Sequence, residues 1–323
     1  MIRQNFNADW TVEKGDGNSR MNSFLGNTQT KTVHLPYDAM IHEARTPDTK
    51  NGAQTGFYPG GEYIFQKHFT VPQAWQGKPV SLVFEGVYQT ALVYLNGWLL
   101  TRNVNGYAEF TVEAGPYLKY GADNLLKVIA DNSLEPNSRW YTGSGIYRPV
   151  RLLVGNKVYL PQDTVRITTR EADEGFALLD VTAQVQSAST VTERVTLQQT
   201  ICREGTAVLT DRQNLLLQPG ESRTVSFRYC VDSPALWSPE NPNLYTSTMQ
   251  VLEGEEELDR EETGFGIRTL SIDAARDAAV ALPVQPRKWQ HRQQSKHRSH
   301  GAEELTEEPG LHRHTQQNEH KQP

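Results

Sequence analysis

Apolar and polar residues alternate in short runs along most of the chain, with the period of two that is typical of β-strands. The clearest run lies in Pro79–Gly97, where Val80, Leu82 and Phe84 alternate with the residues between them. The run ends in Asn96-Gly97, which separates two apolar segments. This dipeptide predicts a two-residue hairpin, because a type I′ turn needs positive φ at both central positions.

Similar runs cover the rest of the first half of the chain. Phe6 and Trp10 are the expected core anchors of the opening strand, and Pro36 excludes a helix from the segment that contains it. Short strands punctuated by turns predict an all-β sandwich, here an N-terminal jelly roll. The strands are expected within Met1–Trp10, Lys31–Ile41, Gly56–Val71, Pro79–Gly97, Gly106–Leu118, Asn124–Asn132 and Ile146–Val154.

A second set of strands begins after Lys157. In one of them Leu179, Val181, Ala183 and Val185 face the same way. About seven strands in roughly 115 residues suit an immunoglobulin-like β-sandwich. We therefore predict a jelly-roll domain over residues 1–155 and an immunoglobulin-like domain over residues 156–273.

Residues 274–323 have a different composition. Of the 41 residues from Pro283 to Pro323 only five are apolar, and six of the nine His of the chain lie there. Such a segment cannot bury enough surface to offset its ordering entropy, so we predict a disordered tail. The spacing of the histidines fits no metal site. The abrupt change indicates a shifted reading frame or the end of a gene model.

Net charge and cysteine content restrict the partners, the location and the kinds of site that we expect. The net charge of −6 disfavours nucleic acid and anionic membranes as partners. There is no apolar run of signal-peptide or membrane-span length, so a soluble cytoplasmic protein is expected. We interpret Cys202 and Cys230 as buried free thiols, and the acidic run Glu253–Glu262 as a solvated hairpin. No cofactor and no metal are expected.

The stretch Glu135–Leu153, EPNSRWYTGSGIYRPVRLL, carries the candidate chemistry. Arg139, Trp140 and Tyr141 place a cation beside two aromatic rings, followed by two glycines. From residue types alone, these rings either fill the core at a junction between loop and strand or form the rim of a sugar site, since sugars present apolar C–H faces to an indole ring and hydroxyls to a guanidinium group.

The segment RWYTGSGIYRPVRL resembles the SRWYxGxGIYRxVxL signature of glycoside hydrolase family 2, the β-galactosidase and β-glucuronidase family. FEGVYQTALVYLNG, LWSPENPNLYT and the GFGIR of Gly264–Arg268 resemble further family segments, in the same order. The segment that contains Asp38 departs from the family, since Tyr37 and Ala39 stand where His and Trp are usual. The resemblance covers about residues 1–273 and implies an N-terminal sugar-binding domain and an immunoglobulin-like domain. Asn96 is then a turn residue rather than a sugar ligand.

The resemblance also implies what chemistry to expect. Retaining hydrolysis uses two carboxyl groups about 5 Å apart, which the family carries on a (β/α)₈ barrel of roughly 250 residues. Only 50 residues follow Asp273, so we predict no catalytic residues and an N-terminal non-catalytic fragment of a β-galactosidase-like enzyme, inactive alone. The alternatives are a stand-alone carbohydrate-binding module and an interaction fragment that complements a barrel-bearing partner polypeptide.

The candidate substrate-binding residues are Arg139, Trp140 and Asp38. They are expected to bind a monosaccharide weakly, because one indole face and one guanidinium group can orient a sugar but cannot enclose it. The competing interpretation is that Trp140 and Tyr141 pack against the second domain.

Overall fold

The computed structural model describes residues 1–15, 30–134, 137–138, 140–273 and 278–280. Within these residues the regular elements are β-strands and short 3₁₀ turns, which confirms the all-β fold class. The described part contains no helix long and apolar enough to cross a membrane.

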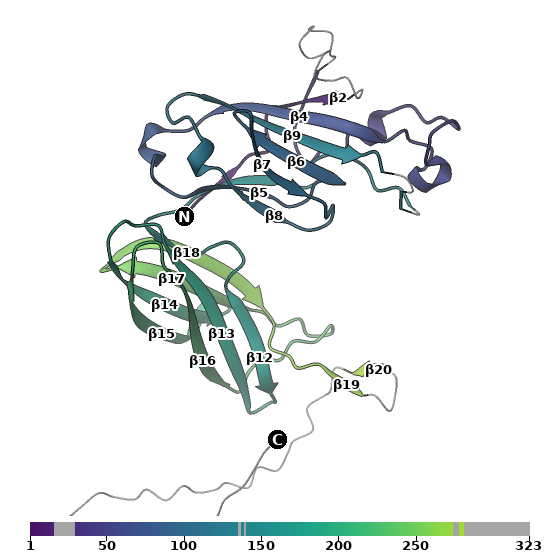
Figure 1. Ribbon diagram of the computed structural model, residues 1–323. Helices are drawn as coiled ribbons and strands as arrows, with labels where there is room; N and C mark the ends of the chain where they lie inside the picture. The colour runs from purple at the N-terminus through teal and green to yellow at the C-terminus, as the bar shows by residue number, and fades with distance from the viewer. Residues whose placement is uncertain (16–29, 135–136, 139, 274–277, 281–323) are drawn as a thin grey trace, which may run out of the picture. The chain divides into compact units, whose positions relative to one another are not determined.

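The first sandwich is a jelly roll of two antiparallel sheets (Figure 1). Its six-stranded sheet has the order β3-β2-β4-β9-β6-β7, and its four-stranded sheet has the order β1-β10-β5-β8. The strands are β1 (Ile2–Asn5), β2 (Trp10–Lys14), β3 (Lys31–Val33), β4 (Gly61–Thr70), β5 (Val80–Phe84), β6 (Thr90–Leu95), β7 (Trp98–Asn103), β8 (Phe110–Glu113), β9 (Asp123–Asn132) and β10 (Val150–Val154). Four 3₁₀ turns join them, η1 (Met40–His42), η2 (Gly52–Thr55), η3 (Gln73–Trp75) and η4 (Gly115–Tyr117).

The core of this sandwich lies between the two sheets and includes the predicted anchors Phe6 and Trp10, both buried. The predicted hairpin joins β6 and β7, with φ of +52° at Asn96 and +88° at Gly97. The side chain of Asn96 donates to the carbonyl oxygen of Tyr117 at 2.8 Å and accepts from the Leu125 N–H at 3.1 Å. These internal bonds confirm the interpretation of Asn96 as a turn residue.

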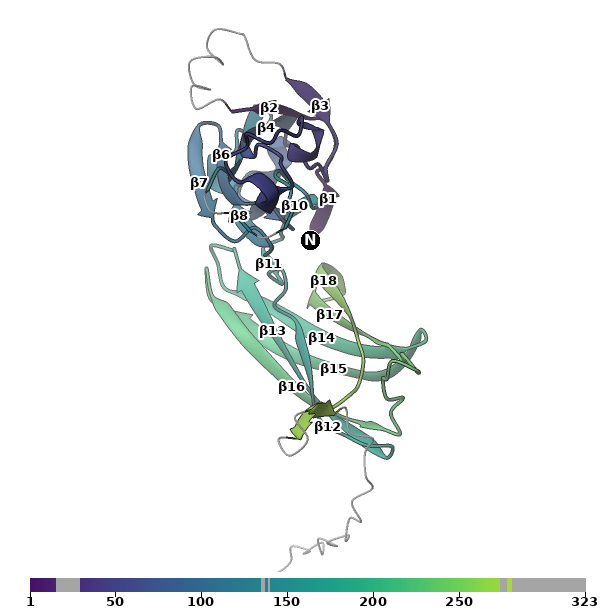
Figure 2. The same ribbon diagram turned by 90° about the vertical axis from the view of Figure 1, so that its right-hand side faces the viewer.

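The second sandwich is immunoglobulin-like and has its own buried core (Figure 2). In one sheet β16 pairs along one edge of β13, and β11 and β12 pair along its other edge; the other sheet has the order β15-β14-β17-β18. Its strands are β11 (Val158–Tyr159), β12 (Arg166–Ala172), β13 (Phe176–Ser187), β14 (Glu193–Arg203), β15 (Thr206–Leu217), β16 (Ser222–Asp232), β17 (Tyr245–Glu253) and β18 (Glu256–Phe265). The alternating residues Leu179, Val181, Ala183 and Val185 of β13 are all buried, as expected.

Beyond β18, the strands β19 (Ser271–Asp273) and β20 (Ala278–Val280) pair in antiparallel fashion. The short strand at Ala278–Val280 lies inside the range for which we predicted a disordered tail. Residues 274–277 and 281–323, the rest of the predicted tail, lie outside the described residues. The domain boundary after residue 155 stays a prediction.

The two cysteines are free, but the prediction that both are buried is wrong. Cys202 is half-buried and Cys230 is exposed. In β16 the residues that alternate inward are Val225, Phe227 and Tyr229, so Cys230 falls on the outward parity and its thiol meets solvent.

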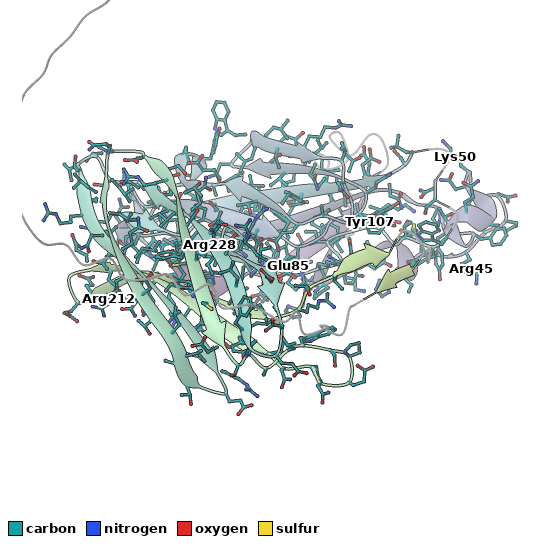
Figure 3. All side chains as sticks on the ribbon, turned by 90° about the horizontal axis from the view of Figure 1, so that it is seen from below. Arg45, Lys50, Glu85, Tyr107, Arg212 and Arg228 are labelled. Atoms are coloured by element: carbon teal, nitrogen blue, oxygen red, sulfur yellow. The ribbon has the colours of Figure 1, made fainter. Side chains whose placement is uncertain are left out.

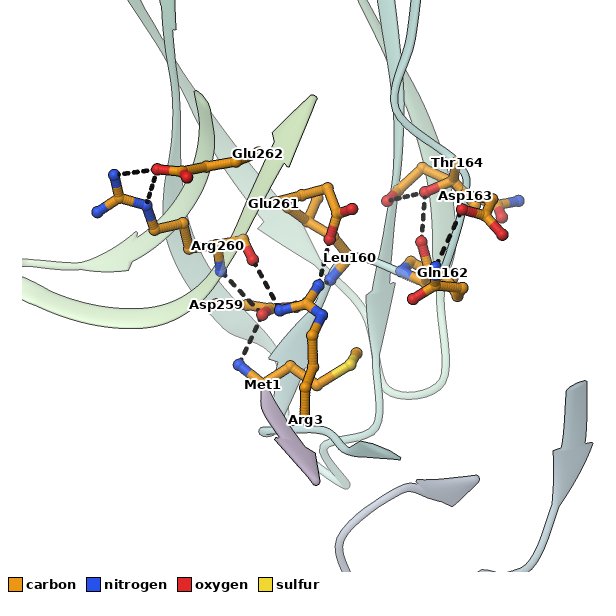
Figure 4. Close-up of polar contacts among 12 residues, drawn as sticks. Met1, Arg3, Leu160, Gln162, Asp163, Thr164, Asp259, Arg260, Glu261 and Glu262 are labelled. Atoms are coloured by element: carbon orange, nitrogen blue, oxygen red, sulfur yellow. Dashed lines mark hydrogen bonds and ion pairs between the residues drawn. The ribbon is translucent and has the colours of Figure 1, made fainter. Parts of the chain in front are cut away.

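The acidic run Glu253–Glu262 forms the predicted hairpin, but it is not uniformly solvated. Asp259 on β18 is only 1% exposed. One of its carboxylate oxygens accepts the Leu160 N–H at 2.7 Å and the other accepts the Met1 amino group at 2.6 Å (Figure 4). A buried carboxylate is stable only when it is paired and hydrogen-bonded, and both conditions are met here.

Candidate functional site

The loop that carries Trp140 is fastened to the segment before η1 by the carboxylate of Asp38. One carboxylate oxygen accepts the Tyr141 hydroxyl at 2.6 Å. The other accepts the backbone N–H of Ser144 at 2.9 Å and that of Met40 at 3.1 Å. Hydrogen bonds to an ionised acceptor are the strong ones, so Asp38 fixes where the loop runs.

Backbone hydrogen bonds continue this attachment. The Ala39 N–H donates to the Ser144 carbonyl oxygen, and Gly145 exchanges two hydrogen bonds with Tyr88. Gly145 has φ of +138°, and a Cβ atom there would lie 2.6 Å from the Tyr37 carbonyl oxygen. A residue with a side chain does not fit, because both the conformation and the space exclude it.

Tyr141 belongs to the first sandwich. Its ring lies edge-on to Tyr58, with centroids 5.2 Å apart. The guanidinium of Arg45, which projects from the loop between η1 and η2 (Figure 3), covers Tyr58 at 5.7 Å from the ring centroid. Burial, followed by the hydrogen bond to Asp38, raises the pKa of Tyr141 well above its ordinary value. Tyr141 is therefore a neutral structural donor.

Trp140 differs from its neighbour, since it is 62% exposed. Its carbonyl oxygen accepts the Ser138 hydroxyl at 3.0 Å, which holds the backbone beside it. Packing of both aromatics against the second domain is wrong, because Tyr141 packs within the jelly roll and Trp140 offers its indole to solvent. Arg139, the third candidate, lies outside the described residues.

Several residues that support this loop were not predicted from the sequence. Asn132, at the end of β9, donates to the Gly143 carbonyl oxygen at 3.0 Å and accepts from the Asn137 side chain at 2.8 Å. The backbone N–H of Asn137 in turn donates to the side chain of Asn51 at 3.2 Å. The one sequence signal was the position of Asn132 as the polar residue that closes an apolar strand.

A second aromatic pair lies beside the loop. Tyr88, which exchanges backbone hydrogen bonds with Gly145, packs edge-on to Tyr107 with centroids 5.3 Å apart. Tyr107 is exposed and is labelled in Figure 3. Burial is the main cause that raises the pKa of Tyr88. Like Tyr141, Tyr88 stays protonated at neutral pH and acts as a hydrogen-bonding group.

Two carboxylates of the segment around η1 are engaged. Asp38 holds the Trp140 loop, and Glu43 pairs with the Lys14 ammonium at 2.8 Å. The described residues contain no group of three or more His, Cys, Asp or Glu side chains that could hold a metal ion. What the candidate site offers is an exposed indole on a firmly held loop, which suits binding by stacking rather than acid–base chemistry.

Family comparison covers both sandwiches. Residues 10–176 match the family model described as glycosyl hydrolase 2 galactose-binding domain-like. Residues 158–268 match the model described as glycosyl hydrolases family 2. The first match alone covers just over half of the 323 residues.

Among curated relatives, a β-galactosidase of Bacteroides ovatus is 34% identical over 273 residues, covering 84% of this chain and 32% of the relative. A putative β-glucuronidase of Formosa agariphila is 30% identical, covering 84% of this chain and 25% of the relative. The chain thus spans a third or less of the length of these relatives.

Solved structures agree with these relatives. A glycosyl hydrolase family 2 member from Bacteroides cellulosilyticus superposes with a TM-score of 0.78 at 29% identity, covering 85% of this chain and 36% of that one. A putative β-galactosidase from Bacteroides fragilis gives 0.75 at 27% identity, covering 84% of this chain and 42% of that one. The matched sequence models, the identities and the two sandwiches together show that the chain belongs to glycosyl hydrolase family 2.

Proposed function

We propose that this chain supplies the non-catalytic sugar-binding and immunoglobulin-like domains of a retaining glycosidase of the β-galactosidase type, and that these 323 residues hydrolyse no glycoside by themselves. The observation that carries the proposal is the Trp140 loop, which Asp38 and Gly145 hold rigidly while the indole stays 62% exposed. Two of its relatives, the β-galactosidase of Bacteroides ovatus and the putative β-glucuronidase of Formosa agariphila, support the substrate class.

Inactivity follows from the chemistry that the family reaction requires. Retaining hydrolysis needs an acid/base carboxyl and a nucleophilic carboxylate about 5 Å apart. In the segment around η1, Asp38 accepts three hydrogen bonds and Glu43 pairs with Lys14, so neither is free for this work. We infer that the parent enzyme carries its catalytic pair on another domain.

The sugar-binding role rests on stacking. Trp140 offers an apolar face to the C–H side of a pyranose ring. Arg139 is its neighbour in sequence, and both Trp140 and Arg139 are proposed to contact the sugar. Asp38 is proposed to position the loop rather than to touch the ligand. An open surface with one indole predicts a dissociation constant of a millimolar or weaker, about 4 kcal/mol.

Two measurements test this function. The purified chain should release no nitrophenol from nitrophenyl β-galactoside or β-glucuronide beyond a mock-purified control. Titration with galactose, followed by NMR of the labelled chain, should shift resonances of residues 137–145 and leave them unshifted in Trp140→Ala. Hydrolysis that co-purifies with the chain would overturn the inactivity, and galactose shifts unchanged in Trp140→Ala would overturn the site.

A second candidate is an interaction fragment that joins a barrel-bearing partner polypeptide. Exposed apolar side chains on the segments that the hydrogen bonds of the Trp140 loop join favour it, namely Ile41 in η1, Phe57 after η2, and Leu134 and Trp140 after β9. Exposed apolar groups that recur on one set of loops indicate a surface that a partner covers. Co-expression with the catalytic barrel of a family relative should then yield a stable complex, and separate elution of the two chains would contradict this role.

A further inference from the structure

We propose a second carbohydrate-binding surface on the first sandwich, an aromatic platform made by Trp98 and Tyr117, which takes a pyranose unit of an oligosaccharide chain. It rests on the proposed function, because a domain of a glycan-degrading enzyme encounters such chains. The platform consists of Trp98 at the start of β7 and Tyr117 at the end of η4.

The two rings are exposed next to each other. Trp98 is 66% exposed, Tyr117 is 39% exposed, and their centroids lie 6.4 Å apart with planes tilted by 47°. Two rings that are this exposed form an open surface, which suits an extended chain that lies across them better than a small molecule that needs enclosure.

Both rings stand on a fixed support. The Asn96 side chain, just before Trp98, donates to the Tyr117 carbonyl oxygen at 2.8 Å and to the Asn124 side-chain oxygen at 2.8 Å. Asn124, which is fully buried, also accepts the Lys119 N–H at 2.8 Å. The hairpin tip and the η4 segment are therefore tied together, and a ligand need not order them on binding.

Polar groups for sugar hydroxyls are available beside the rings. β7 is the outermost strand of its sheet, so one edge of its backbone pairs with no other strand among the described residues. An open strand edge presents N–H and C=O groups. Aromatic faces together with such groups match a pyranose ring, whose C–H face is apolar and whose hydroxyls point outward.

The platform is separate from the Trp140 loop. Asn124, which holds the platform, is at the start of β9, and Asn132, which holds the Trp140 loop, is at its end. The two are eight residue steps apart along the strand, a distance of about 26 Å. One monosaccharide cannot contact both, so the two surfaces can be tested independently.

The experiment is native electrophoresis of the whole chain in gels that contain soluble β-1,4-galactan, xyloglucan or arabinoxylan. The variants are Trp98→Ala and Tyr117→Ala at the platform, Trp140→Ala at the other surface and, as an exposed control outside both, Val191→Ala in the second sandwich, with folding checked by circular dichroism. At least one polysaccharide should retard the parent chain, and Trp98→Ala should weaken that affinity by about fivefold or more. Val191→Ala should keep it.

Each result is decisive. No retardation of the parent chain by any of the three polysaccharides overturns the platform, as does retardation that Trp98→Ala and Tyr117→Ala both retain. Loss only in Trp140→Ala also overturns it, while supporting the site of the proposed function. Loss only in Trp98→Ala and Tyr117→Ala supports the platform whatever the galactose titration shows at residues 137–145.

Discussion

The Tyr141 hydroxyl donates to the Asp38 carboxylate at 2.6 Å, although 103 positions of sequence separate the two residues. The bond joins the loop after β9 to the segment before η1. Asp38 also accepts hydrogen bonds from the backbone N–H groups of Met40 and Ser144, so this one side chain positions the loop of the candidate site.

Asp38→Ala should therefore destabilise the first sandwich. Three donors lose their acceptor, and we expect a loss of about 3 kcal/mol in the free energy of unfolding. Tyr141→Phe removes one of the three bonds and should cost about 1 kcal/mol. Urea unfolding followed by circular dichroism measures both. An Asp38→Ala protein as stable as its parent would mean that the carboxylate is free to serve a ligand.

Gly145→Ala should be far more damaging than an alanine at another glycine with positive φ. A Cβ atom at Gly145 would lie 2.6 Å from a backbone oxygen, whereas one at Gly254, with φ of +59°, meets nothing within 4 Å. Gly254→Ala should cost only the left-handed conformation, about 1–2 kcal/mol. Thermal melts of the two variants provide the comparison, and equal melting temperatures would contradict the close approach.

Asp259→Ala should destabilise the chain strongly, because Leu160 and the Met1 amino group lose a buried partner. Removing one member of a buried pair costs about 3–5 kcal/mol. Glu262→Ala is the control, since Glu262 is exposed and pairs with Arg260 at the surface, where a pair is worth about 0–1 kcal/mol. Similar urea midpoints for the two variants would show that Asp259 is dispensable.

The ion pair between Glu193 and Lys157 gives a pH dependence. The Ser189 hydrogen bond and then the Lys157 ammonium, at 3.0 Å, lower the pKa of Glu193 below its ordinary value. A lowered pKa in the folded state contributes stability above the ordinary pKa, and that contribution disappears as pH falls through the folded value. Glu193→Gln should thus lower the urea midpoint at pH 7 and matter little at the lowest pH at which the fold persists. A difference between variant and parent that does not shrink on acidification would contradict this.

Cys230 should react with a thiol reagent in the native protein, whereas Cys202 should react more slowly because it is half-buried. Labelling with a disulfide dye should show one fast thiol, which Cys230→Ser removes. If the fast phase survived in Cys230→Ser and disappeared in Cys202→Ser, the assignment of the exposed cysteine would be wrong.

The local sequence pattern predicted the features that depend only on residues close together in the sequence. The Asn96-Gly97 turn needs only positive φ at two positions, and the inward row from Leu179 to Val185 needs only the strand period. Both were therefore visible in the sequence. The alternation of inward and outward residues in β16 also indicated that Cys230 is exposed. We predicted a buried thiol because cysteine is so often buried.

Contacts between distant segments could not be predicted in the same way. Nothing in the sequence around Asp259 separates it from its acidic neighbours, yet it alone of the run meets the Leu160 N–H. At the candidate site, the family resemblance identified Asp38 and Trp140. Only the fold shows that the Asp38 carboxylate is occupied by Tyr141 and Ser144, whereas the Trp140 indole remains exposed.

The contact between Arg3 and Glu261 has a consequence for synthesis of the chain. Arg3 lies on β1, an edge strand held on its other side by β10, and its guanidinium pairs with a carboxylate 258 positions later. On the ribosome the jelly roll is complete in sequence long before Glu261 is made, and domains generally fold as units, N-terminal first. We expect β1 to be the last strand of its sandwich to become protected, and ribosome-bound chains that end before or after β18 should differ in protease cleavage near Arg3. The first strand made would then be the last one secured.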